Sequence, residues 1–134
     1  SYGDDLLIQV AERIQQLLPE NSYFGRFGGD EFVLLLYSKK ENFPFIRKTL
    51  TYLHEAFSKA FYLNKQAVFV TPSMGVSLFP TDADSCEQLL VNADTALYKA
   101  KEAGRNRILY FNYEMKEEFE KQHMLEQQLN NWNS

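Results

Sequence analysis

Two adjacent glycines, Gly28 and Gly29, stand directly before two carboxylates and an unbroken apolar run, and this order restricts the fold more than any other feature of the chain. Glycine reaches backbone angles that other residues avoid and places no Cβ near a ligand. The apolar run Phe32–Tyr37 has no polar alternation, which predicts a strand covered on both faces in the middle of a sheet. Asp30 and Glu31 are therefore expected at the tip of a tight turn. Acidic groups beside bare backbone suit a metal–phosphate site.

The same turn has a plainer interpretation. A Gly-Gly pair between two extended segments is a common hairpin turn, and acidic residues in turns are usually only solvated. Taken alone, the turn is weak evidence for a function, so the rest of the chain has to decide between the two interpretations.

Composition limits both the fold class and the classes of partner. The chain has 134 residues, 45% hydrophobic and 15% aromatic, which is enough for one packed domain. The single cysteine, Cys86, cannot form an internal disulfide, as is typical of a reducing compartment. No segment approaches a membrane span, and a net charge of −4 argues against a nucleic-acid surface. We expect a cytoplasmic domain without nucleic-acid or direct membrane contact, and tethering to a membrane protein is compatible with this.

Apolar spacing and the positions of glycine and proline predict the order of the elements. Helices are expected at residues 3–18, 45–57, 85–103 and 113–132. Strands are expected at residues 23–27, 32–37, 61–63, 67–70, 75–78 and 108–111. This order predicts an α/β domain with a largely antiparallel central sheet flanked by helices.

The string from Gly28 to Phe32 reads Gly-Gly-Asp-Glu-Phe and follows Arg26 and Phe27. It resembles the signature of the GGDEF family, the diguanylate cyclase domains that join two GTP molecules into cyclic di-GMP. The resemblance implies the palm-like (ferredoxin-like) fold of nucleotide cyclases and polymerases. It also implies GTP as substrate, Mg²⁺ or Mn²⁺ as cofactor, and a homodimer, because each domain holds one GTP.

The resemblance gives the residues of the turn their roles. Asp30 would hold the metal ion, and Glu31 would support the metal site or remove the 3′-hydroxyl proton. The backbone N–H groups of Gly28 and Gly29 would approach the phosphates.

Asp4 lies in a second stretch that resembles the family, Gly-Asp-Asp-Leu-Leu at residues 3–7. The resemblance implies that Asp4 accepts hydrogen bonds from the guanine edge. A carboxylate suits this role, because guanine presents two neighbouring N–H donors. The alternative is a charge that only stabilises the N-terminus of the helix.

Residues 93–101, followed by Gly-Arg-Asn at 104–106, resemble another signature of the family, in which Lys101 and Arg105 contact the GTP phosphates. The alternative is that these cations complement the helix dipole, which explains Lys101 but not the whole run. A further match, Ser-Met-Gly at residues 73–75, is expected to be structural, with Gly75 allowing close approach of a helix.

The chain also departs from the family pattern. It begins after the first helix and the first strand of the family, and that strand carries an aspartate ligand of the metal. We therefore expect an N-terminally truncated GGDEF domain at residues 1–112, and activity of these residues alone is doubtful. Residues 19–22 lack the Arg-x-x-Asp motif of product inhibition, so none is expected through that site.

Residues 113–134 resemble the connector from a GGDEF domain to an EAL phosphodiesterase domain. The alternative is a terminal helix that packs on its own domain. Two functions are open at this point. One is a diguanylate cyclase, and the other is a catalytically silent GTP-binding module that regulates an adjacent EAL domain.

Overall fold

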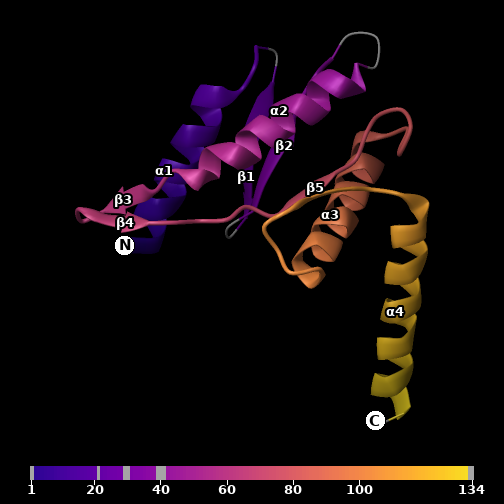
Figure 1. Cartoon of the computed structure of the whole chain (residues 1–134). Coiled ribbons are helices and arrows are strands. Elements are labelled where there is room, and N and C mark those ends of the chain that lie inside the picture. The colour runs from indigo at the N-terminus through magenta and orange to yellow at the C-terminus, as the bar shows by residue number, and fades with distance from the viewer. Residues whose placement is uncertain (1, 21, 29–30, 39–41, 133–134) are drawn as a thin grey trace. The chain divides into compact units, whose positions relative to one another are not determined.

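The computed structural model describes residues 2–20, 22–28, 31–38 and 42–132 (Figure 1). The chain forms two compact units, Ser1–Thr71 and Pro72–Ser134. Unit 1 contains α1 (Tyr2–Leu17), β1 (Tyr23–Gly28), β2 (Glu31–Leu35), α2 (Phe43–Glu55), the 3₁₀ helix η2 (Ala56–Ser58), β3 (Phe61–Leu63) and β4 (Gln66–Val68). Unit 2 contains β5 (Met74–Val76), α3 (Cys86–Glu102), β6 (Ile108–Tyr110) and α4 (Tyr113–Trp132). The predicted α/β order of elements is confirmed.

The strands pair two by two. Among the described residues, β1–β2 and β3–β4 pair antiparallel, and β5–β6 pairs parallel. Two of these three pairings agree with the expected antiparallel character. In the described part of the chain, the three strand pairs form three separate two-stranded sheets rather than one continuous sheet. The β3–β4 turn contains only Asn64 and Lys65, whose φ angles are 50° and 67°. Positive φ at both central residues is typical of the type I′ hairpin, whose twist matches that of the strands.

The prediction that Phe32–Tyr37 is a strand covered on both faces is wrong. β2 ends at Leu35, and the side chains of Leu35 and Tyr37 are 43% and 65% exposed. The remaining residues of the strand are half-buried. In the part of the chain that the structure describes, β2 pairs with β1 alone, so its second edge has no neighbouring strand. An apolar run without alternation is therefore not sufficient evidence for a central strand.

Arg13 joins α1 to the end of α2 in unit 1. Its guanidinium donates to three backbone oxygens, those of Ala56 (3.2 Å), Lys59 (2.6 Å) and Ala60 (2.8 Å). The same group lies 3.6 Å from the ring centroid of Phe61. Carbonyls after the end of a helix lack intrahelical donors, so Arg13 supplies the partners that this segment needs. The planar fork of arginine can reach several oxygens at once.

Alanine in place of Arg13 is expected to lower the free energy of unfolding by about 2–3 kcal/mol, because charged hydrogen bonds and a cation–π contact are lost together. Lysine in place of Arg13 should retain only part of this stabilisation, because a single ammonium cannot reproduce the planar set of donors of a guanidinium. Urea denaturation measures the effect. Lys48→Ala, which removes an exposed cation from α2, is the matched control and should change stability by less than about 0.5 kcal/mol. An equal, small effect of both variants would contradict this role of Arg13.

In unit 2, α3 connects the parallel strands β5 and β6 and is anchored by polar contacts at its N-terminal half. Ser85 caps the helix, since its hydroxyl accepts from the backbone N–H of Gln88 at 3.1 Å. Asn92, only 2% exposed, donates to the backbone oxygen of Asp82 at 2.7 Å. The Asp82 carboxylate in turn accepts from the backbone N–H of Leu78 at 2.7 Å. These bonds fix the loop after β5 against the helix.

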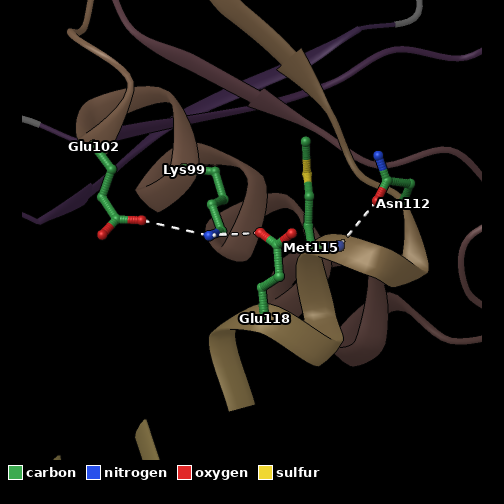
Figure 2. A network of polar contacts seen from close by, with 5 residues as sticks. All are labelled: Lys99, Glu102, Asn112, Met115 and Glu118. Atoms are coloured by element: carbon green, nitrogen blue, oxygen red, sulfur yellow. Dashed lines mark hydrogen bonds and ion pairs between the residues drawn. The ribbon is translucent and has the colours of Figure 1, made fainter. Parts of the chain in front are cut away.

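The first half of α4 packs on α3 (Figure 2). The Lys99 ammonium lies 2.9 Å from the Glu118 carboxylate and 3.6 Å from that of Glu102. The ring of Tyr98 meets the ring of Phe119 edge-on, with centroids 5.4 Å apart. From residue 123 to residue 131, the side chains of α4 are exposed. These contacts between α4 and α3 therefore lie in the first half of α4.

The Lys99–Glu118 contact predicts a pH-dependent contribution to stability. The hydrogen bond with Glu118 is the main cause that raises the pKa of Lys99 above 10.5, and burial opposes it. The interaction that raises the pKa of Lys99 stabilises the folded state below pH 10.5. This stabilisation is lost as the pH rises through the pKa that Lys99 has in the folded protein. Because Glu118 is 56% exposed, the contribution at pH 8 is at most about 1 kcal/mol.

Unfolding of Lys99→Gln and of the unchanged protein at pH 8 and pH 11.5 measures this contribution. The stability difference between them should be present at pH 8 and shrink at pH 11.5. Lys121→Gln, which changes an exposed lysine of α4, should show no such difference. A Lys99→Gln effect that is equal at both pH values would contradict an ionic origin.

Candidate functional site

The predicted glycine–acid turn joins β1 to β2. β1 ends at Gly28, β2 begins at Glu31, and these two residues are partners across the hairpin. The register shifts between Arg26 and Gly28, and such a bulge bends a strand and re-aims the residues that follow it. Glu31 is half-buried at the first position of β2. Gly29 and Asp30 lie outside the described residues, so their roles stay predictions.

Asp4 lies in the first turn of α1, and its residue is exposed. α1 and β1 run in opposite directions in Figure 1. With the standard rise per residue, the part of α1 from Asp4 to its end is about 20 Å long, and β1 is about 17 Å long. Asp4 and Gly28 therefore lie at the same end of unit 1. This placement is what a guanine contact by Asp4 and a phosphate contact at the turn would need.

Lys101 and Arg105 lie at the C-terminal end of α3 in unit 2. Lys101 is half-buried in the last turn of the helix, and Arg105 is exposed. α3 ends at Glu102, close to the predicted end at residue 103, and Gly104, with φ of 115°, follows its C-cap residue Ala103. The N–H of Arg105 donates to the oxygen of Ala100 at 2.9 Å, and the N–H of Gly104 donates to that of Lys101 at 3.4 Å. These two bonds form the Schellman motif, which satisfies the last carbonyls of a helix.

Gly75 fixes the position of this helix on the sheet. A Cβ at Gly75 would overlap the backbone oxygen of Ala93 and the backbone nitrogen of Leu97, and would lie 2.7 Å from the Leu97 Cα. The backbone of α3 thus lies directly on β5, which only glycine permits. The expected structural role of Gly75 is confirmed.

Two residues near Arg105 were not among the predicted site residues. The Oγ of Ser73 accepts from the N–H of Asn106 at 3.2 Å, and the Nε of Arg107 donates to the backbone oxygen of Arg105 at 3.0 Å. Both contacts depend on how β5 and β6 are paired, which local sequence patterns do not specify. The one signal in the sequence is the Gly-Arg-Asn run itself, because glycine and asparagine each tolerate left-handed backbone angles.

The acidic turn and the cations belong to different units. Asp4, Gly28 and Glu31 lie in unit 1, and Lys101 and Arg105 lie in unit 2. That the two groups meet around one triphosphate stays a prediction.

The metal ligand proposed from the sequence, Asp30, is outside the part of the chain described. Among the described residues, no three histidine, cysteine or acidic side chains gather to hold a metal ion. The donor chemistry of the turn nevertheless fits Mg²⁺ or Mn²⁺, which prefer carboxylate oxygens and are usually bound by few protein ligands together with substrate phosphates.

A model of one protein family matches most of the chain. It is described as "Diguanylate cyclase, GGDEF domain" and covers residues 1–107. The chain belongs to the GGDEF family. The family includes proteins named as cyclases, such as the probable diguanylate cyclase DgcC of Escherichia coli, which is 31% identical over 105 residues. That alignment covers 78% of this chain and 28% of DgcC.

Another GGDEF relative is MucR of Pseudomonas aeruginosa, named a bifunctional diguanylate cyclase/cyclic di-GMP phosphodiesterase. It is 38% identical over 114 residues, which cover 84% of this chain and 16% of MucR. The chain thus spans about a sixth of the length of this curated relative.

Solved structures of GGDEF domains resemble the fold. The GGDEF domain of TpbB (YfiN) from Pseudomonas aeruginosa matches with a TM-score of 0.82 at 28% identity, covering 89% of this chain and 69% of that one. An EAL/GGDEF domain protein from M. capsulatus matches with a TM-score of 0.73 at 33% identity, covering 81% and 70%. The expected palm-like cyclase fold is confirmed.

In the described ranges, no helix combines the length and the apolar character that crossing a bilayer requires.

Proposed function

We propose that this GGDEF domain is part of a diguanylate cyclase, which condenses two GTP molecules into cyclic di-GMP and releases pyrophosphate. The observation that carries the proposal is the complete acid pair, Asp30 and Glu31, in the sequence that links the end of β1 to the start of β2 at Glu31. Both carboxylates have a role in the proposed cyclase reaction, and their joint presence therefore favours the cyclase over a silent module. Identity of 31–38% to proteins named as cyclases supports the same function.

In the proposed reaction, the 3′-hydroxyl oxygen of one GTP attacks the α-phosphorus of the other. A phosphorus–oxygen bond forms, the bond to the β-phosphate oxygen breaks, and pyrophosphate leaves with the electron pair. Repeating the step from the second GTP closes the ring. Since each domain holds one GTP, two domains have to face each other, and the active form is a homodimer.

Different residues of the domain bind guanine, bind the phosphates and accept the proton in this proposal. Asp4 accepts the N–H groups of guanine, and the backbone at Gly28 and Gly29 approaches the phosphates. Glu31 takes up the 3′-hydroxyl proton or supports the metal site. A divalent ion bound with GTP at Asp30 supplies charge neutralisation and alignment of the triphosphate.

Lys101 and Arg105 act on the leaving group in this proposal. Negative charge accumulates on pyrophosphate as its bond breaks, and a cation fixed beforehand stabilises that charge without reorganisation. Their position at a helix end anchored on β5 through Gly75 supplies such fixed geometry.

A second candidate function is a catalytically silent GTP-binding module that regulates a linked EAL phosphodiesterase domain. It is favoured by the bifunctional name of MucR and by the EAL/GGDEF neighbour. The exposed distal half of α4, residues 123–131, suits a connector to such a domain. We accordingly propose a GGDEF domain at residues 1–112, a connector at residues 113–134, and a cytoplasmic location.

Incubating the full-length natural protein with GTP and Mg²⁺ distinguishes the two candidates. Formation of cyclic di-GMP and pyrophosphate is the result we expect. Tight GTP binding without product would favour the regulatory module, and the absence of both binding and product would contradict both candidates.

A further inference from the structure

The turn that follows α3 has an unusual backbone. Three consecutive residues have positive φ: Gly104 at 115°, Arg105 at 63° and Asn106 at 49°. Glycine adopts such angles freely and asparagine tolerates them, but arginine is disfavoured there, because its Cβ crowds the backbone. A residue persists in this region only when its surroundings hold it.

Two side chains of unit 2 hold the turn from opposite sides. The Nε of Arg107 donates to the backbone oxygen of Arg105 at 3.0 Å, and the Ser73 Oγ accepts from the N–H of Asn106 at 3.2 Å. The Arg107 guanidinium also lies against the turn, since a Cβ at Gly104 would be 3.0 Å from its Nη2. The turn is thus bonded on both sides of the Arg105–Asn106 peptide.

The same two residues tie the turn to the parallel strands. The N–H of Met74, directly after Ser73, donates to the backbone oxygen of Arg107 at 2.9 Å. The start of β5 and the residue before β6 therefore form one frame around residues 104–106. The direction of the Arg105 side chain depends on this frame. If φ of Arg105 changed from the left-handed to the extended region, its side chain would point in a different direction.

We propose that Ser73 and Arg107 are positioning residues, which hold the left-handed turn so that the exposed guanidinium of Arg105 is presented to the triphosphate. This inference rests on the proposed function for its ligand. Fixing a phosphate-binding cation before the nucleotide arrives avoids part of the ordering that binding would otherwise require. Neither residue touches the nucleotide in this account.

A matched pair of variants at position 107 tests the proposal. In Arg107→Gln, the side-chain N–H lies the same number of bonds from the backbone as the arginine Nε, so the donor stays while the charge is lost. In Arg107→Met, a side chain of similar length lacks the donor. Ser73→Thr and Ser73→Ala form the corresponding pair for the acceptor. Lys121→Met, at an exposed position of α4, controls for the loss of a cation.

Two measurements on the full-length protein follow from this design. The Kd for a non-hydrolysable GTP analogue with Mg²⁺ should rise about tenfold in Arg107→Met and Ser73→Ala, as for one weakened charged hydrogen bond. It should change less than about threefold in Arg107→Gln and Ser73→Thr. Amide hydrogen exchange at Asn106, measured without nucleotide, should accelerate in the first two variants only.

The outcomes separate this inference from the proposed function. Equal loss of affinity in Arg107→Gln and Arg107→Met would show that the charge of Arg107 itself matters, and would overturn the positioning role. Unchanged exchange at Asn106 in Arg107→Met and Ser73→Ala would also overturn it, even where GTP binds. If the unchanged protein bound no GTP, the proposed function and the ligand of Arg105 would both fail. Faster exchange in Arg107→Met would then still support the holding of the turn.

Discussion

Alanine in place of Asp30 or Glu31 is expected to reduce cyclic di-GMP formation by the full-length protein by about a thousandfold or more. Asp30 is proposed to hold the metal ion that neutralises the triphosphate, and Glu31 lies at the first position of β2 beside it. Glu31 is not among the buried residues of the core. Their removal should therefore abolish turnover without unfolding the protein.

Product formation with GTP and Mg²⁺ is measured by chromatography, and circular dichroism checks the fold of each variant. Asp84→Ala is the control, since it removes an exposed acid from the loop before α3. It should leave turnover within about twofold of the unchanged protein, as is typical of exposed positions. Undiminished turnover in Asp30→Ala or Glu31→Ala would refute the cyclase mechanism proposed for this turn.

Alanine in place of Gly75 is expected to destabilise unit 2 by about 3 kcal/mol, at the upper end of overpacking effects. The added Cβ would overlap the backbone of α3 at Ala93 and Leu97, and backbone atoms cannot move aside as a flexible side chain can. Separation of α3 from β5 would also displace Lys101 and Arg105. GTP affinity should therefore fall together with stability.

Thermal and urea denaturation measure the effect of Gly75→Ala. Gly3→Ala is the control, because a Cβ at Gly3 meets nothing within 4 Å. Gly3 lies within α1, where alanine should be neutral or should stabilise by up to about 1 kcal/mol. Equal stability of Gly75→Ala and the unchanged protein would contradict the close packing of α3 on β5.

Features set by neighbouring residues were predictable from the sequence. The hairpin turn after Gly28, the end of α3 before Gly104 and the helical segments all depend on local backbone preference and apolar spacing. Gly75 was identified through its resemblance to a segment of the family, and its expected role of allowing close approach of a helix is confirmed.

Features set by long-range pairing were not predictable. The parallel pairing of β5 with β6 brings Ser73 to Asn106, 33 positions apart, and no local pattern encodes it. The exposure of Leu35 and Tyr37 was missed for the same reason, because the apolar character of a strand does not reveal which of its edges has a partner. The roles of Asp4 and Lys101 came from the resemblance to the family and stay predictions.

The central claim is that the acidic turn and the cations after α3 hold one and the same GTP. A crystal structure of the full-length protein with a non-hydrolysable GTP analogue and Mg²⁺ tests it most directly. The account predicts a metal ion bound to Asp30, with the β- and γ-phosphates in contact with both Lys101 and Arg105. A nucleotide held at the turn, with Lys101 and Arg105 on the opposite side of the molecule, would contradict it.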